Sequence, residues 1–133
     1  MVNIQETKEK IHQYEYECMM WTRSLEYLKQ ENAYLKDRLT EVVDHHSDKY
    51  FLAQAEHFQN QFIIKDEFLD ELKHDVYTQI ELLKKEINVS DSKHDDLTLH
   101  QDKLREQMVY IERDFLNLRN NFQNFLNTQI TLF

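Results

Sequence analysis

The 133-residue sequence contains no glycine and no proline. These two residue types supply most tight turns, and glycine supplies the backbone conformations that other residues avoid. Their absence excludes hairpin-rich β folds. It also excludes glycine-lined phosphate loops, dinucleotide-binding motifs and nucleophile elbows, in which the backbone closely approaches a ligand. Most enzyme scaffolds are excluded with them, so we expect a protein without catalytic activity.

Cysteine and long apolar runs are also scarce. The one cysteine, Cys18, cannot form an internal disulfide, which is typical of a reducing compartment. No run reaches the roughly 18 apolar residues of a membrane span. The beginning, Met1 to Glu6, has no basic stretch followed by an apolar one. We therefore expect a cytoplasmic protein with no membrane insertion.

Basic residues are fewer than acidic ones, at 16 against 25, and the formal net charge is −9. Such a surface repels the phosphate backbone of nucleic acids and anionic lipid headgroups. We expect no nucleic-acid partner. The partner is instead expected to be another protein or a further copy of the chain in a homo-oligomer.

What the sequence does contain is heptad periodicity in three stretches, at about residues 4–43, 48–88 and 95–131. Spacings of three and four place residues along one face of a helix, called the seam below. The first seam is Ile4, Thr7, Ile11, Tyr14, Cys18, Trp21, Leu25, Leu28, Asn32, Leu35, Leu39 and Val42. The second is Phe51, Ala55, Phe58, Phe62, Lys65, Leu69, Leu72, Val76, Gln79 and Leu83. The third is Leu97, Gln101, Leu104, Met108, Ile111, Phe115, Leu118, Phe122, Phe125, Gln129 and Leu132.

Two short polar breaks separate these stretches. In the first, Ser47 or Asp48 can cap the next helix, and residues 88–96 form the second. Short connectors favour antiparallel neighbours. We predict an all-α, antiparallel three-helix bundle or coiled coil (up-down-up) of long helices, forming a single domain over residues 1–133. Two alternatives are dimerisation into a longer bundle and two helices that continue as one.

Polar residues interrupt the seams. Asn32 is predicted to specify register, because a polar side chain at such a position costs stability but penalises wrong pairings. Lys65, Gln79, Gln101 and Gln129 either form polar layers or point outwards at the seam edge, and we favour the second.

A third row on the first helix, Met20, Tyr27 and Tyr34, repeats every seven residues away from the seam. We predict that these side chains stay partly exposed and bind a partner; scattered surface tyrosines are the alternative. Apolar residues outside the other seams indicate the same surplus of apolar surface. Examples in the third helix are Leu116, Leu126 and Ile130.

Seven histidines raise the question of a metal site. The two Glu-x-x-His motifs, Glu9 to His12 and Glu71 to His74, are expected to face outwards because an apolar neighbour occupies the seam in each. His45 and His46 in the first connector are weak candidate ligands. Cys18 falls on the seam, where burial raises its pKa. We expect no catalytic residue, no metal and no cofactor.

The residues from Trp21 through Leu25 and Leu28 to the run ENAYLKDRL at 31–39 resemble small uncharacterised coiled-coil proteins of bacteria. The run FQNQF at 58–62 adds to this likeness. With Trp21 in the first of three helices, the chain is also similar in outline to a spectrin-type repeat. These resemblances imply a helical bundle and no activity.

We therefore predict a non-catalytic coiled-coil structural or adaptor protein that acts through protein–protein contacts. A small acidic helical chaperone of an export or assembly system is the alternative. A metal-binding helical bundle is the remote third.

Overall fold

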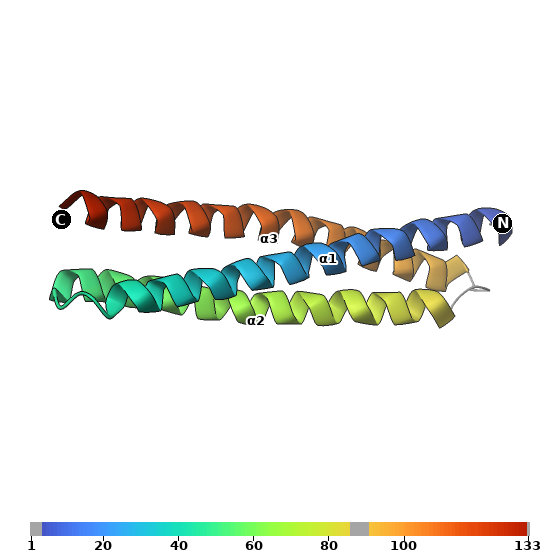
Figure 1. The fold of residues 1–133 in the computed structure, drawn as a ribbon. Helices are drawn as coiled ribbons and strands as arrows, with labels where there is room; N and C mark the ends of the chain where they lie inside the picture. Colours follow the sequence, from blue (N-terminus) through green and yellow to red (C-terminus); the bar gives the residue numbers. More distant parts are fainter. Residues whose placement is uncertain (1–3, 86–90, 133) are drawn as a thin grey trace. The chain divides into compact units, whose positions relative to one another are not determined.

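A computed structural model describes residues 4–85 and 91–132, with side chains for residues 5–85 and 94–128. It contains three helices, α1 (Ile4–Val43), α2 (Lys49–Lys85) and α3 (Asp91–Leu132), and no strand occurs within these residues (Figure 1). The helices pack against one another, so the predicted all-α three-helix bundle is confirmed.

The helix bounds follow the heptad pattern closely. α1 has the predicted bounds, and α2 begins one residue later than predicted. α3 begins at Asp91, before the expected start near 95, because Ser and Asp side chains are favourable in the first turn of a helix. The predicted end of the second helix near residue 88 lies outside the described residues.

The connector between α1 and α2 is built without glycine. The amides of Asp44 and His46 donate to the carbonyls of Thr40 and Val43, each at 3.1 Å, and continue the last helical turn. The Phe51 amide donates to Asp48 Oδ2 at 3.1 Å. Of the two predicted caps, Asp48 is therefore the one used. Within the described ranges no residue has a positive φ, which explains why glycine is not needed here.

Contacts divide the chain into two compact units, each containing part of every helix. The first unit comprises Met1–Glu26 and Asp70–Tyr110, and the second comprises Tyr27–Leu69 and Ile111–Phe133. The prediction of a single domain stays a prediction.

In the first unit, α1 and α3 run parallel. Tyr14 donates a hydrogen bond to Thr98, and Gln101 donates to Glu17, so both pairs are separated by 84 positions. The core consists of seam residues from all three helices, including Ile11, Cys18, Trp21, Leu25, Leu72, Val76, Leu83, Leu97, Leu104 and Met108. The predicted seam therefore forms the core of this unit.

In the second unit, α2 and α3 run antiparallel. Phe58 contacts Phe122 with ring centroids 5.4 Å apart, and Phe51, earlier on α2, contacts Phe125, later on α3, at 5.1 Å. Phe62 and Phe122 are 0% exposed and meet edge to face. Burying each such ring stabilises the fold by about 2 kcal/mol.

None of the three helices, over the residues that the structure describes, has an apolar stretch long enough to cross a membrane.

Candidate protein-contact surfaces and polar layers

A buried polar layer crosses the first unit. Gln79 of α2 and Gln101 of α3 occupy seam positions and are both 0% exposed. Gln79 Nε2 donates to Gln101 Oε1 and to the carbonyl of Leu97, each at 3.0 Å. Gln101 Oε1 also accepts from Cys18 Sγ at 3.6 Å, and His100 Nδ1 lies 2.6 Å from Gln79 Oε1. Side chains from all three helices therefore meet in this layer.

The prediction that Gln79 and Gln101 point outwards is wrong. Their amides pair with each other and with backbone carbonyls, so the cost of removing them from water is largely offset. Lys65 interrupts the seam of the second unit, where its ammonium binds the carboxylate of Asp114. Burial lowers the pKa of Lys65. The side chain of Gln129 lies outside the described residues.

A charged pair closes one edge of the polar layer. Gln101 Nε2 donates to Glu17 Oε1 at 2.8 Å. The Arg105 guanidinium donates to both Glu17 oxygens, at 2.8 and 2.7 Å, in a bidentate contact. Burial alone would raise the pKa of Glu17, but the hydrogen bonds from Arg105 and Gln101 outweigh it and hold the pKa below its ordinary value. The layer thus ends in an ion pair that joins α1 to α3.

Cys18 is a core residue, as predicted. Its side chain is 0% exposed, and burial raises the pKa of the thiol to about 11. Because the thiolate is the reactive form, this cysteine is protonated and unreactive at neutral pH.

Asn32 forms a second polar layer, in the second unit. It is 0% exposed, and Nδ2 donates to the Phe62 carbonyl at 2.9 Å and to Asp66 Oδ1 at 2.8 Å. The Lys36 ammonium binds the other oxygen of Asp66. Burial would raise the pKa of Asp66, but hydrogen bonds from Lys36 and Asn32 hold it below its ordinary value.

The predicted register role of Asn32 can be compared with this pairing. Its contacts join α1 to one particular turn of α2, so a shifted register would bury the amide without Asp66. Among the described residues, Asn32 Oδ1 is buried without a hydrogen-bond partner, which costs stability. That Asn32 specifies register stays a prediction.

Two tyrosines form an exposed ridge on α1 in the second unit, called the tyrosine ridge below. Tyr27 and Tyr34 are 55% and 62% exposed. The Tyr27 hydroxyl donates to Glu31 Oε1 at 2.7 Å, which raises the pKa of Tyr27 and orients its ring along the helix. On α3, Leu116 is 44% exposed one helical turn before Arg119, whose charge acts on the Tyr27 hydroxyl. The predicted exposure is confirmed, and partner binding stays a prediction.

Met20, the third predicted contact residue, belongs to the first unit and is partly exposed, as predicted. Its neighbour Met19 is exposed to a similar extent. Methionine adapts its shape to a partner, so this part of α1 also offers apolar contact area.

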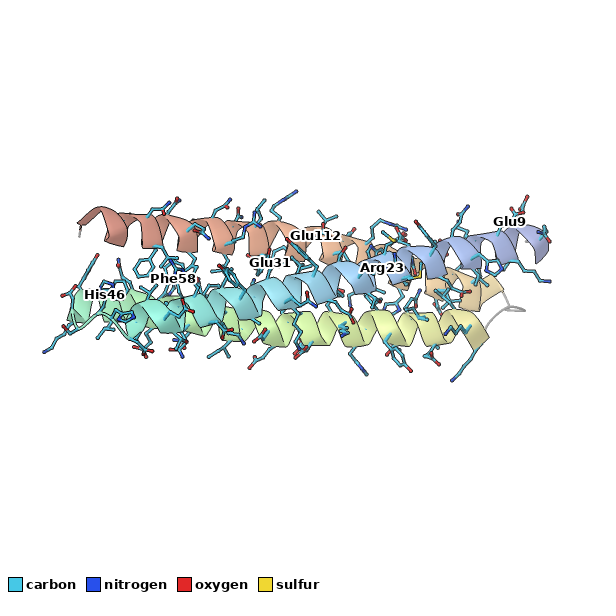
Figure 2. All side chains as sticks on the ribbon, viewed as in Figure 1. Glu9, Arg23, Glu31, His46, Phe58 and Glu112 are labelled. Carbon is cyan, nitrogen blue, oxygen red and sulfur yellow. The ribbon has the colours of Figure 1, made fainter. Side chains whose placement is uncertain are left out.

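The histidines do not gather into a site. The side chains of both Glu-x-x-His motifs are exposed, and Figure 2 shows Glu9 projecting away from its helix. In the first connector, the His46 ring packs on Phe51 with centroids 4.2 Å apart. No group of three or more His, Cys, Asp or Glu side chains in residues 5–85 and 94–128 is arranged to hold a metal ion.

The heptad pattern does not reveal an open groove between α2 and α3 in the second unit, called the uncharged groove below. Its volume is about 500 Å³, and its lining includes Tyr50, Ala53, Gln54, Phe58, Asn124 and Phe125. Figure 2 shows the Phe58 ring between these two helices. One sequence signal points to it: residues 120–128 carry no charge, in a chain whose charged residues make up 31%.

Comparison with protein-family models, curated proteins and solved structures finds no match to this chain. The resemblances to bacterial coiled-coil proteins and to spectrin-type repeats therefore gain no support from these comparisons.

Proposed function

We propose that this protein is a non-catalytic coiled-coil structural or adaptor protein that acts through protein–protein contacts, with the tyrosine ridge as a contact surface. One observation carries the proposal. Most seam residues of the second unit, such as Leu35 and Leu69, are buried within it, while Tyr27 and Tyr34 remain 55% and 62% exposed on α1. More than half of each tyrosine side chain therefore faces solvent.

The ridge suits a helical partner. Residues seven apart stay aligned along a helix that follows a heptad repeat, so a second helix can contact both rings. Tyrosine contributes a large contact area at a low cost in side-chain entropy. The hydrogen bond to Glu31 already orients Tyr27, which lowers that cost further.

The chemistry of the buried groups supports a structural role. The thiol of Cys18 is buried with a raised pKa, and the amides of Gln79 and Gln101 are used in pairing helices. The net charge of −9 favours a protein partner over nucleic acid. We place the protein in the cytoplasm, where a lone cysteine stays reduced.

Tagged capture from native lysate tests this function, with bound proteins identified by mass spectrometry. The ridge variant carries Tyr27→Ser and Tyr34→Ser. The matched control carries Tyr16→Ser and Tyr77→Ser, two tyrosines of the first unit that are 62% and 60% exposed. We expect the wild type and the control to retain one partner and the ridge variant to lose at least about nine-tenths of it.

Equal retention by all three proteins would contradict a role for the ridge, and equal loss from both variants would indicate a non-specific effect. A captured client that is insoluble without this protein would favour the chaperone alternative over the adaptor.

A further inference from the structure

In the uncharged groove, part of the aromatic core of the second unit is left uncovered. Phe58 lies at a seam position, yet it is only half-buried, whereas its seam neighbours Phe51 and Phe62 are 1% and 0% exposed. Ala53 and Asn124, which line the same groove, have short side chains that cover less of the ring than a Lys or Glu stem would. The floor is therefore aromatic, with the Phe58 and Phe125 rings 5.1 Å apart.

The rim of this groove carries amides in place of charges. Gln54, Asn121 and Asn124 each carry an amide with donor and acceptor atoms, and the hydroxyl of Thr128, which donates to the Asn124 carbonyl at 2.9 Å, can still accept. None of the residues that line the groove is an Asp, Glu, Lys or Arg. A partner with a charged contact face would bury its charges here without a counter-charge, which is costly.

We propose that the uncharged groove is the interface of a homodimer, occupied by the same groove of a second copy. Two chains of net charge −9 repel each other, and the repulsion is weakest where they meet through faces without charge. A two-fold interface must also be complementary to itself, and amides can pair with identical amides across such an axis.

Tyr50 completes this interface. It stands at the edge of the groove and is 71% exposed. Across a two-fold axis, Tyr50 of each copy covers the half-buried Phe58 of the other and so removes both rings from water. The proposed dimer rests on the proposed function, because it is also a protein–protein contact. It uses α2 and α3, however, whereas the tyrosine ridge lies on α1.

The test is sedimentation equilibrium of the full chain over a wide range of concentration. The wild type is expected to pass from the monomer mass of 16.4 kDa to twice that mass as concentration rises. Ala53→Glu places like charges across the axis and is expected to weaken the dimer at least about tenfold. Ala33→Glu, the same substitution at an exposed alanine of α1, is expected to leave the dimer unchanged. Circular dichroism of both variants confirms folding.

A mixture of Ala53→Glu and Ala53→Lys tests whether the groove faces its own copy. Opposite charges across the axis are expected to restore a dimer that neither variant forms alone. A wild type that stays monomeric, a dimer that Ala53→Glu leaves intact, or equal loss with Ala33→Glu would each overturn the proposal. None of these results bears on the tyrosine ridge, whose failure appears only in the capture experiment.

Discussion

Gln101 is the residue on which the polar layer of the first unit depends. Its oxygen accepts hydrogen bonds from Gln79 and Cys18, and its nitrogen donates to the Tyr14 carbonyl at 3.2 Å and to Glu17. One amide thereby joins all three helices. The contribution of Gln101 to stability therefore depends on whether its partners are present. Single and double substitutions of Gln101 and a partner can measure this dependence.

Replacing Gln101 with leucine is expected to lower the free energy of unfolding by about 1–3 kcal/mol, because Gln79 loses a buried acceptor. The double variant Gln79→Leu with Gln101→Leu is expected to cost less than the sum of the single changes, since no unpaired amide remains. Urea unfolding measures all three. The exposed control Gln13→Leu should stay within about 0.5 kcal/mol of wild type, and strict additivity would contradict the pairing.

Glu17 makes stability depend on pH. Because its folded pKa lies below the ordinary value of 4.5, its stabilisation is fully present above that value and is lost as the pH falls through the folded pKa. We expect the fall in Tm from about pH 5 to about pH 3 to be smaller in Glu17→Gln than in wild type. Thermal unfolding followed by circular dichroism measures this, with Glu67→Gln as an exposed control. Parallel curves for wild type and Glu17→Gln would contradict the role of the Arg105 contact.

At the scale of the element, the start of α2 depends on one cap. Asp48 accepts the Phe51 amide, whereas Ser47 beside it is exposed in the connector. Asp48→Ala is expected to cost about 1 kcal/mol, because one amide of the first turn loses its partner. Urea unfolding of Asp48→Ala beside Ser47→Ala measures the difference. A cost for Ser47→Ala equal to that for Asp48→Ala would show that the cap had been misassigned.

The helices could be predicted from the sequence because the heptad period decides which side chains face inwards. Ile11, Leu25 and Leu104 are buried for this reason. The hydrogen-bond partners of Gln79 and Gln101 could not be predicted from the sequence. They depend on which turn of α2 lies beside which turn of α3, and a regular heptad period is the same in every register. The heptad period does not predict the uncharged groove either, since the groove depends on the lengths of the side chains near Phe58.

At the scale of the whole molecule, the buried residues are mostly apolar, whereas the charged residues are mostly exposed. The interior of each unit is largely apolar and is crossed by a hydrogen-bonded polar layer, around Gln79 and Gln101 in the first unit and around Asn32 in the second, whereas the chain as a whole carries a net charge of −9. Against that acidic background, the tyrosine ridge and the uncharged groove are the surfaces that we propose as protein contacts, and both carry exposed aromatic side chains. The ridge lies on α1, and the groove lies between α2 and α3.

The most direct test of the contact function is photo-cross-linking in native lysate with benzoylphenylalanine at position 34. Position 110 serves as the control, because Tyr110 is 60% exposed on α3 of the first unit and, like Tyr34, is an exposed tyrosine. The tyrosine ridge predicts one discrete cross-linked product from position 34 and none from position 110. No product from position 34, or the same product from both positions, would contradict it.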